Sequence, residues 1–535
     1  MKNYSNLTFF FLIFLLFCLQ LPVSGQISPT NFDPQKIVFV DNEHPGASDF
    51  NSGIERSSPL KTLQHAINVC KNITAKIIVA SGHYRSYLDI VTNKTIIIEA
   101  EEPGTVFISG SDVFKKWAKS DSLYWHTWPY DWGFFADSAS CFGDCHLSDY
   151  QKRREMVFVD GKPLLQVLHF DQLKKGTFYI DEKMDKVFIN MENNTHPDNH
   201  NIEVATRGYD VYDQGRNGSL VKIQVYNGKG LIIKGIVFQH VANTMHQDAL
   251  TITNTDNVIM EDCIFQWNNG VGVEFFKCNN VSMQNCVIRN NGERGMGVGS
   301  GENFFFNNLK IYGNNWRTNA DKIIAHDAAG IKIFGSTKNV IIDNSEVYNN
   351  FCNAVWFDWN NENYIIRNSR IYNNQEAGIM VEGSRKRALI ENCEIYNNNS
   401  GIKGYGHANV TVENCKIYAN DTQLTFGQDG RIVTQDNNWE IDSKDWKLYG
   451  NMIYATEPSQ KIFTFFEYSN PNVPSTKSVE NFFETVRSDF NTYYHPDFKN
   501  IFPDGESLFE TPLSLSKWTE KTKQDRNSKF ELPSF

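Results

Sequence analysis

Cysteine is scarce in this chain, and that excludes one common way of holding a small fold together. The 535 residues include ten cysteines, too few for a disulfide framework in a chain of this length. Cys141 and Cys145 lie close enough in the sequence to leave a small loop disulfide open. They make only half of a zinc shell, and no Asp cluster suits calcium, so we expect no metal and no cofactor.

Long apolar runs are also absent, except at the start. Leu7–Leu21 is apolar, follows Lys2 and precedes the small-residue stretch Val23–Gly25. This run is shorter than the roughly 20 residues that a membrane span needs, so residues 1–25 are predicted to be a cleavable signal peptide. The expected location is therefore secreted or periplasmic, with no membrane span.

Positive charge is in deficit. Lys and Arg number 51 against 62 Asp and Glu, a formal net charge of −11. An acidic chain without a dense basic groove is a poor partner for nucleic acid or for a polyuronate.

Asparagine, in contrast, is frequent and recurs at regular intervals in the middle of the chain. Between about Leu220 and Asn420 a string related to N-V-x-I-x-N-C-x-I-Y-N-N repeats about every 23 to 24 residues, with one longer interval before Gly330. That period is too short for helical repeats, and the alternating Val and Ile are typical of strands whose side chains stack inside successive coils. The pattern predicts an all-β parallel β-helix. The small residues that open each first strand are taken as Ala249, Gly270, Gly295, Gly330, Ala354, Gly378 and Gly401.

Two columns within the repeat have predicted roles. One is expected to be an amide ladder at a bend, comprising Asp262, Asn285, Asn308, Asn344, Asn368, Asn392 and Asn414. The next position holds small residues that we expect to be buried and structural, namely Cys263, Cys286, Leu309, Ser345, Ser369, Cys393 and Cys415.

The chain divides into five predicted segments. A signal peptide (1–25) precedes an N-terminal cap with the first coils (26–112), where Pro59–Cys70 has the spacing of a short amphipathic helix. Residues 113–205 break the repeat and alternate like hairpin strands, which predicts an inserted β-sandwich-like domain. The main repeats (206–430) carry the candidate site. The last coils and a C-terminal cap (431–535) include a helix expected over Leu513–Asp525.

Two acids close matching strands of the repeat. Asp358 ends V-W-F-D, and Glu382 ends I-M-V-E one coil later. If apolar residues alternate inward, both acids face outward in one column, whose other members are expected to be Thr253, Glu274, Gly299, Phe334 and Tyr405. Neighbouring strands lie about 4.8 Å apart, close to the 5–5.5 Å that separates the carboxyl groups of retaining glycosidases and below the 6.5–9.5 Å of inverting ones.

Other side chains near this pair have both functional and structural interpretations. Trp356 and Trp359 flank the acids and could stack on a sugar face, and Trp356 could instead cover exposed core. His326 and Asp327 precede the strand of Lys332, and these three are predicted to bind substrate; His326 could instead hold its loop in place.

These residues resemble a known family. The strings H-D-A-A-G-I-K-I, V-W-F-D-W and I-M-V-E, with the N-terminal cap and the inserted domain, resemble glycoside hydrolase family 120, the β-xylosidases. Related β-helix hydrolases such as family 141 share the scaffold. The resemblance covers roughly residues 36–420 and implies a right-handed, pectin-lyase-like β-helix. It also implies that Asp358 is the nucleophile and Glu382 the general acid/base. Here I-M-V-E-G-S replaces the F-V-E-V pattern expected of the xylosidases.

The leading hypothesis is therefore a retaining glycoside hydrolase that acts on an oligo- or polysaccharide of neutral sugars, such as a β-xyloside. Two alternatives stay open. The same scaffold suits a polysaccharide lyase or uronan epimerase with Lys332 or Lys403 as base. It also suits a non-catalytic glycan-binding surface protein. The sequence leaves the sugar, the linkage, endo or exo action and the oligomeric state open.

Overall fold

The computed structural model describes residues 33–134, 147–208, 219–226, 229–318, 327–428, 432–433, 439–440, 442–467, 477–505 and 511–533. The predicted signal peptide, Cys141, Cys145 and His326 lie outside these residues.

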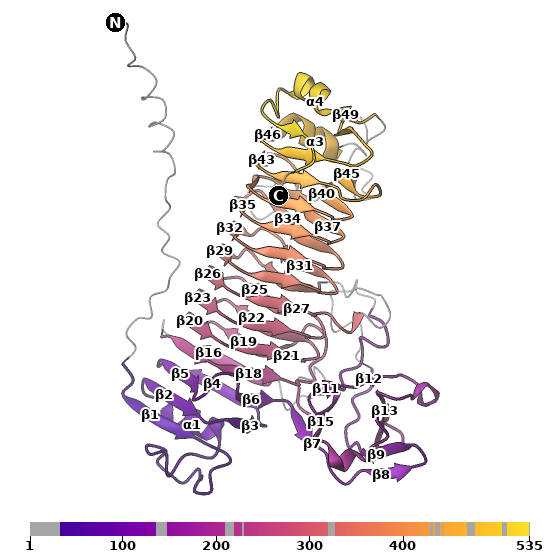
Figure 1. Ribbon diagram of the computed structural model, residues 1–535. Coiled ribbons are helices and arrows are strands. Elements are labelled where there is room, and N and C mark those ends of the chain that lie inside the picture. The colour runs from indigo at the N-terminus through magenta and orange to yellow at the C-terminus, as the bar shows by residue number, and fades with distance from the viewer. Residues whose placement is uncertain are drawn as a thin grey trace, which may run out of the picture.

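Three long parallel sheets wind together into an elongated β-helix that runs from the N-terminal to the C-terminal end of the molecule (Figure 1). The first sheet has 13 strands, in the order β1 (Lys36–Val40), β2 (Ala75–Val79), β5 (Ile96–Ala100), β17 (Leu231–Lys234), β20 (Asp256–Glu261), β23 (Asn279–Gln284), β26 (Glu302–Asn307), β29 (Lys338–Asp343), β32 (Glu362–Arg367), β35 (Ala388–Glu391), β38 (Val410–Glu413), β43 (Lys447–Tyr449) and β46 (Arg487–Asp489).

The second sheet carries the candidate site. Its 11 strands are β4 (Leu88–Thr92), β16 (Val221–Val225), β19 (Asp248–Thr253), β22 (Val271–Phe276), β25 (Met296–Gly299), β28 (Ala329–Phe334), β31 (Asn353–Phe357), β34 (Ala377–Ser384), β37 (Ser400–His407), β40 (Thr422–Gln428) and β45 (Lys461–Glu467).

The third sheet again has 13 strands. They are β3 (Gly82–Tyr84), β6 (Val106–Ser109), β18 (Ile236–Gln239), β21 (Ile264–Gln266), β24 (Val287–Arg289), β27 (Lys310–Tyr312), β30 (Glu346–Tyr348), β33 (Arg370–Tyr372), β36 (Glu394–Tyr396), β39 (Lys416–Tyr418), β44 (Met452–Tyr454), β47 (Thr492–Tyr494) and β50 (Lys529–Phe530).

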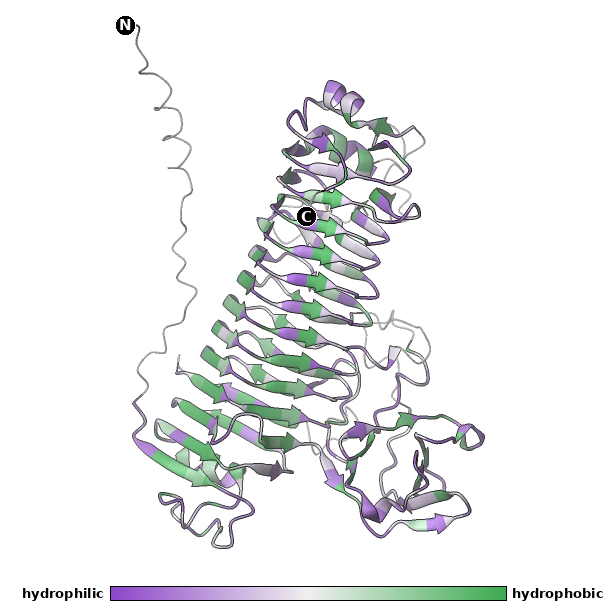
Figure 2. Ribbon diagram, viewed as in Figure 1, coloured by the Kyte–Doolittle hydropathy of each residue, from purple (hydrophilic) through white to green (hydrophobic). Residues whose placement is uncertain are grey.

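Apolar residues recur along the strands of the β-helix (Figure 2). Their side chains from all three sheets form one buried core, as the period-two pattern requires. The predicted column of small residues is buried as expected, and its four cysteines are free thiols. Their sulfur atoms lie near backbone carbonyls inside the coil, as for Cys263 and the carbonyl of Glu261 at 3.3 Å. These thiols therefore pack the turn.

The continuous amide ladder lies at a different turn from the one expected. A buried column donates from each side-chain nitrogen to the side-chain oxygen of the next member at 2.9–3.0 Å; its members are Asn268, Asn291, Asn314, Asn350, Asn374, Asn398 and Asn420. The expected column instead adopts left-handed backbone, with φ between 47° and 55° at all seven positions. The backbone conformation explains the residue types in this column, because Asn and Asp tolerate positive φ better than most residues.

Helices cover both ends of the β-helix. At the N-terminal end α1 (Leu63–Cys70) begins at the N-cap Thr62 and buries Leu63, Ala66, Ile67 and Cys70 against the first coil. At the other end lie α3 (Lys477–Thr485), α4 (Leu515–Thr522) and the short strands β41 (Ile432–Val433), β42 (Trp439–Glu440), β48 (Asn500–Phe502) and β49 (Leu513–Ser514). The helix expected over Leu513–Asp525 corresponds to α4, while α3 was not expected.

Residues 111–205 form two further sheets beside the N-terminal half of the β-helix (Figure 1). One contains β11 (Lys162–Pro163), β10 (Val157–Val159), β15 (Ile202–Ala205) and β7 (Ser111–Val113). The other contains β12 (Leu165–Gln166), β13 (Thr177–Asp181), β14 (Lys186–Asn190), β9 (Leu123–Thr127) and β8 (Ala118–Ser120). The 3-10 turns η2 (Phe170–Gln172) and η3 (Pro197–Asn199) lie between strands. Both sheets contribute to one hydrophobic cluster, which includes Val157, Ile202, Phe178 and Ile189.

A buried arginine fixes this unit to the β-helix. Arg317, which follows β27, donates from Nη2 to the carbonyl of Glu155 at 2.9 Å and from Nη1 to Oε1 of Gln166 at 3.1 Å. The side-chain nitrogen of Asn269 adds a bond to the carbonyl of Arg153 at 3.2 Å. Such charge-assisted bonds are among the stronger ones in proteins, so the two sheets are held close to the coils that carry the candidate site.

Candidate functional site

The two candidate acids lie on neighbouring strands of the second sheet. Asp358 directly follows β31 and Glu382 lies within β34; Trp356 pairs with Met380 and Phe357 with Val381. Because the register continues from these pairs, Asp358 and Glu382 are consecutive members of one column. The backbone N–H of Asp358 bonds to the carbonyl of Ile333 at 2.8 Å, which holds the end of β31 against β28.

A lysine from the preceding strand contacts Asp358. Lys332 Nζ lies 3.0 Å from Asp358 Oδ2 and 2.6 Å from Asp327 Oδ1. Lys332 is only 3% exposed, so its ammonium is largely withdrawn from water and depends on these carboxylates. Of the predicted substrate-binding residues, Lys332 thus contacts Asp358 directly, and Asp327 is linked to Asp358 through Lys332.

Trp356 connects this ion pair to the second acid. Its Nε1 donates to Glu382 Oε2 at 3.2 Å, and Lys332 Nζ lies 3.7 Å from the centre of its ring. Trp356 is 8% exposed and packs with Ala329, Ala377 and Met380. Its described contacts are therefore with protein groups, and they orient both Lys332 and Glu382.

Trp359 lies beside Glu382 for a local reason. Its backbone is left-handed (φ 50°), and a Cβ on Gly383 would lie 3.1 Å from its ring atom Cε3. Gly383 itself has φ 53°, so both conformation and space require glycine there. The indole of Trp359 thus covers the residue after Glu382.

One expected alignment is wrong. Glu274 was placed in the column of Asp358, but it pairs with Gly297, and Gly297 pairs with Lys332. The small residue equivalent to Gly295 in that coil is Gly272, not Gly270, because Asp248 pairs with Val271 and Leu250 with Val273. The regular 23-residue step from Asn268 to Asn291, a ladder bond at 3.0 Å, would have given the correct register.

Around Glu274 lies a charged group that sequence reasoning missed; we call Asp248, Glu274, Glu293, Arg294 and His246 the second charged group. Burial raises the pKa of Asp248 well above its usual value, and the adjacent charge of Glu274 raises it further. Burial also raises the pKa of Glu274, although Arg294 opposes this. Burial alone would raise the pKa of Glu293 as well, but its ion pairs with His246, at 2.7 Å, and Arg294 lower it.

No group of three or more His, Cys, Asp or Glu side chains in the described part of the chain is arranged to hold a metal ion. No helix in that part is both long and apolar enough to span a membrane.

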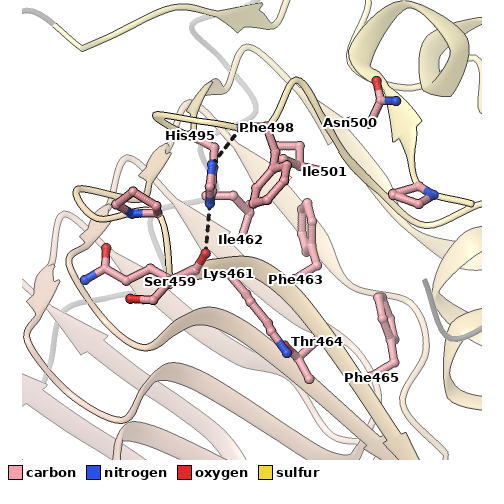
Figure 3. Close-up of a pocket in the computed structure, with 13 residues that line it drawn as sticks. Ser459, Lys461, Ile462, Phe463, Thr464, Phe465, His495, Phe498, Asn500 and Ile501 are labelled. Carbon is pink, nitrogen blue, oxygen red and sulfur yellow. Dashed lines mark hydrogen bonds between the residues drawn. The ribbon is translucent and has the colours of Figure 1, made fainter. Parts of the chain in front are cut away.

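A pocket of about 510 Å³ lies elsewhere, at the C-terminal end of the β-helix (Figure 3). Its lining is largely apolar and includes Ile462, Phe463, Phe465 and Ile501. His495 also lines this pocket. Its Nε2 bonds to the carbonyl of Gln460 at 2.9 Å, and its Nδ1 accepts from the backbone N–H groups of Asp497 and Phe498. Both ring nitrogens are therefore engaged by backbone, and the carboxylate pair is the better candidate for chemistry.

Coils that share three parallel sheets make this chain a parallel β-helix protein, and the family comparison gives the hand of the coil. A family model described as a right handed beta helix region matches residues 189–365, 248–417 and 358–443. No curated protein sequence matches the chain significantly.

A solved structure, that of XylC, gives the same fold. The complex of XylC with xylose is 15% identical, with a TM-score of 0.65 over 93% of this chain and 86% of that chain. The A-module of the mannuronan C-5 epimerase AlgE6 from Azotobacter vinelandii is 13% identical, with a TM-score of 0.49 over 92% of this chain and 97% of that chain. At 15% identity the likeness to XylC shows the fold alone.

Proposed function

We propose that this protein is a carbohydrate-active enzyme, a retaining glycoside hydrolase that acts on a neutral glycan such as a β-xyloside. The observation that carries the proposal is that the two stacked carboxyl groups have different surroundings. Asp358 is paired with the Lys332 ammonium at 3.0 Å, whereas Glu382 is 8% exposed and receives the neutral Trp356 N–H at 3.2 Å. Two carboxyl groups in unlike environments are the usual basis for dividing nucleophile and acid roles.

In the proposed reaction the Asp358 carboxylate attacks the anomeric carbon while Glu382 gives its proton to the departing glycosidic oxygen. A glycosyl ester on Asp358 results. Glu382, now a carboxylate, takes a proton from water, whose oxygen attacks the same carbon and releases Asp358. The assignment of roles follows the family resemblance. The adjacent strands, about 4.8 Å apart, support retention rather than inversion.

The xyloside preference has two supports, the resemblance to family 120 and the fold likeness to XylC, which was solved with xylose. The lyase or epimerase alternative needs a basic lysine. Lys332 is a poor candidate, because its ammonium is held by Asp327 and Asp358.

Hydrolysis of a panel of nitrophenyl glycosides by wild type, Asp358→Asn and Glu382→Gln tests the proposal. We expect wild type to cleave the β-xyloside and Asp358→Asn to lose at least about 10³-fold in kcat. Glu382→Gln should lose less on this good leaving group than on natural xylo-oligosaccharides. Glu362→Gln, on the first sheet, is the matched control.

Early-time NMR of the released sugar gives the stereochemistry. Retained configuration agrees with the proposal. Inversion, or full activity of both variants, would contradict it. An ultraviolet-absorbing unsaturated product would identify a lyase instead, and glycan binding without turnover in wild type would identify a binding protein.

We also propose that the protein is exported after cleavage of residues 1–25. Mass spectrometry of the mature protein should find Gln26 as its first residue. A mature chain that retains Leu7–Leu21 would contradict this.

A further inference from the structure

The outer face of the second sheet continues from the acid pair toward the N-terminal coils, where the second charged group lies. Glu274 on β22, Gly297 on β25 and Lys332 on β28 are consecutive members of one column. Asp358 follows β31, the next strand. Glu274 is thus three strand spacings of about 4.8 Å, roughly 14 Å, from Asp358 along the helix. One pyranose ring cannot span that distance.

Gly297 makes room for the Glu274 carboxylate. A Cβ on Gly297 would lie 2.7 Å from Glu274 Oε2 and 3.2 Å from its Cγ, and its three nearest atoms would all belong to Glu274. The carboxylate therefore leans across β25, away from its own strand and toward the acid pair.

An aromatic surface lies beside this carboxylate. Phe276 and Phe334 are half-buried, and their rings lie over Gly299, where a Cβ would meet Phe334 Cε2 at 2.6 Å and Phe276 Cδ2 at 3.0 Å. Because β25 presents only Gly297 and Gly299 outward here, side chains from the neighbouring strands lie over it. The carboxylate of Glu274 lies over Gly297, and next to it the two aromatic rings lie over Gly299.

The second charged group has polar capacity that its own contacts do not use. The side chain of Arg294 is only 9% exposed, and its closest carboxylate approaches are 3.3 Å to Glu293 Oε1 and 4.0 Å to Glu274 Oε2. The 3.3 Å approach is made by Nε, which faces Glu293 Oε1 as an ion pair but without the geometry of a hydrogen bond among the residues that the structure describes. A buried guanidinium whose ion pairs are long and poorly aligned gains from a bound group that accepts a hydrogen bond from it.

We propose that Glu274, Asp248 and Arg294, with the rings of Phe276 and Phe334, form a second sugar subsite on the same outer face of the second sheet. Carboxyl and guanidinium groups bind vicinal hydroxyls of a neutral sugar, and the rings lie against its C–H face. This rests on the proposed hydrolase function. Glu382, which protonates the leaving oxygen, lies on the C-terminal side of Asp358, so the subsite holds the glycan on the side opposite the leaving group. The substrate is therefore an oligosaccharide with at least two sugar residues on that side.

The electrostatic state of the group agrees with neutral hydroxyls as ligands. The carboxyl groups of Asp248 and Glu274 lie within hydrogen-bonding reach, and burial raises the pKa of both. A pair that shares a proton offers both a donor and acceptors, which suits hydroxyl groups.

The test compares nitrophenyl β-xyloside, β-xylobioside and β-xylotrioside as substrates of wild type, Glu274→Gln and Gly297→Ala. In wild type we expect kcat/KM to rise at least about tenfold from the monosaccharide to the trisaccharide glycoside. In both variants this increase in kcat/KM with chain length should largely disappear. Glu274→Gln removes the carboxylate, and Gly297→Ala displaces the Glu274 side chain. Glu302→Gln, an exposed acid on β26, should keep the ratio. Thermal unfolding establishes that each variant is folded.

A wild type whose kcat/KM does not rise with chain length, or a ratio that both variants keep, would overturn the subsite while leaving hydrolysis intact. If wild type hydrolyses no glycoside, the proposed function fails separately. Calorimetry with xylotriose then decides the subsite: binding to wild type that Glu274→Gln weakens about tenfold supports it, and equal or absent binding refutes it.

Discussion

Lys332 Nζ lies 3.0 Å from Asp358 Oδ2, while its own side chain is almost completely buried between neighbouring strands. The same ammonium contacts Asp327 at 2.6 Å and the face of Trp356 at 3.7 Å. One cation therefore links three of the residues that the sequence singled out, and it does so from the column adjacent to that of the acids.

Replacing Lys332 by Met should reduce kcat about 10²-fold on a cleaved glycoside. The change removes the positive charge that neutralises Asp358 and Asp327 but keeps a long apolar stem. Steady-state kinetics on the best nitrophenyl glycoside measures the effect. Lys403→Met, three strands along the same column, is the control and should retain activity. A Lys332→Met enzyme within twofold of wild type would show that the ion pair does not support catalysis.

Trp356→Phe should lower kcat about tenfold while the protein stays folded. Phenylalanine fills most of the same space but cannot donate to Glu382 Oε2, and a typical hydrogen bond contributes about 0.5–1.5 kcal/mol. Trp359→Phe is the control, because Trp359 also lies beside Glu382 but packs on Gly383, and this variant should keep more activity. If both variants lose activity equally, the indole N–H of Trp356 has no specific role.

Periodicity predicted much of this arrangement, and its failures have physical causes. The 24-residue step from Asp358 to Glu382 gave neighbouring strands because the intervening turns have constant length. Gly270 misled the alignment because it also needs to be glycine: a Cβ there would lie 2.3 Å from the carbonyl oxygen of Gln247. A small residue marks close backbone approach, and two occur in one coil.

The contacts of Lys332 were beyond sequence reasoning for another reason. Alternation places its side chain on the outer face, but its burial comes from Asp327, just before the same strand, and from Trp356, on the next coil. The amide ladder shows the same limit. Two asparagine columns have the same period, and only the backbone separates the left-handed column from the buried one.

Asn398→Ala should destabilise the fold far more than Asn399→Ala, although the residues are adjacent. Asn398 is buried, accepts from Asn374 at 2.9 Å and donates to Asn420 at 3.0 Å, so its loss leaves buried polar groups unsatisfied at about 1–3 kcal/mol each. Asn399 is exposed. Thermal unfolding of both variants measures the difference. Equal midpoints would mean that the ladder adds nothing to stability.

Two buried histidines should make the protein less stable below neutral pH. Burial lowers the pKa of His407 to about 4 and that of His240 to about 3. At His407 the Nδ1–H donates to the carbonyl of Ala408 at 2.7 Å, so Nε2 accepts from the Tyr364 hydroxyl at 2.8 Å. The neutral ring satisfies both bonds, whereas a second ring proton would oppose the tyrosine hydroxyl.

The sign of the effect follows from these values. The unfolded chain binds a proton at His407 near pH 6.5 and the folded chain only near pH 4, so its contribution is complete above about 6.5 and is lost as the pH falls toward 4. When His407 is protonated in both states, the free energy of unfolding is lower by about 3 kcal/mol. Unfolding midpoints at pH 7.0, 5.5 and 4.5 should therefore fall steadily in wild type. His407→Gln should show a shallower fall, with the His240 share remaining, and the exposed His169→Gln should match wild type. A His407→Gln slope equal to that of wild type would show that His407 titrates alike in both states.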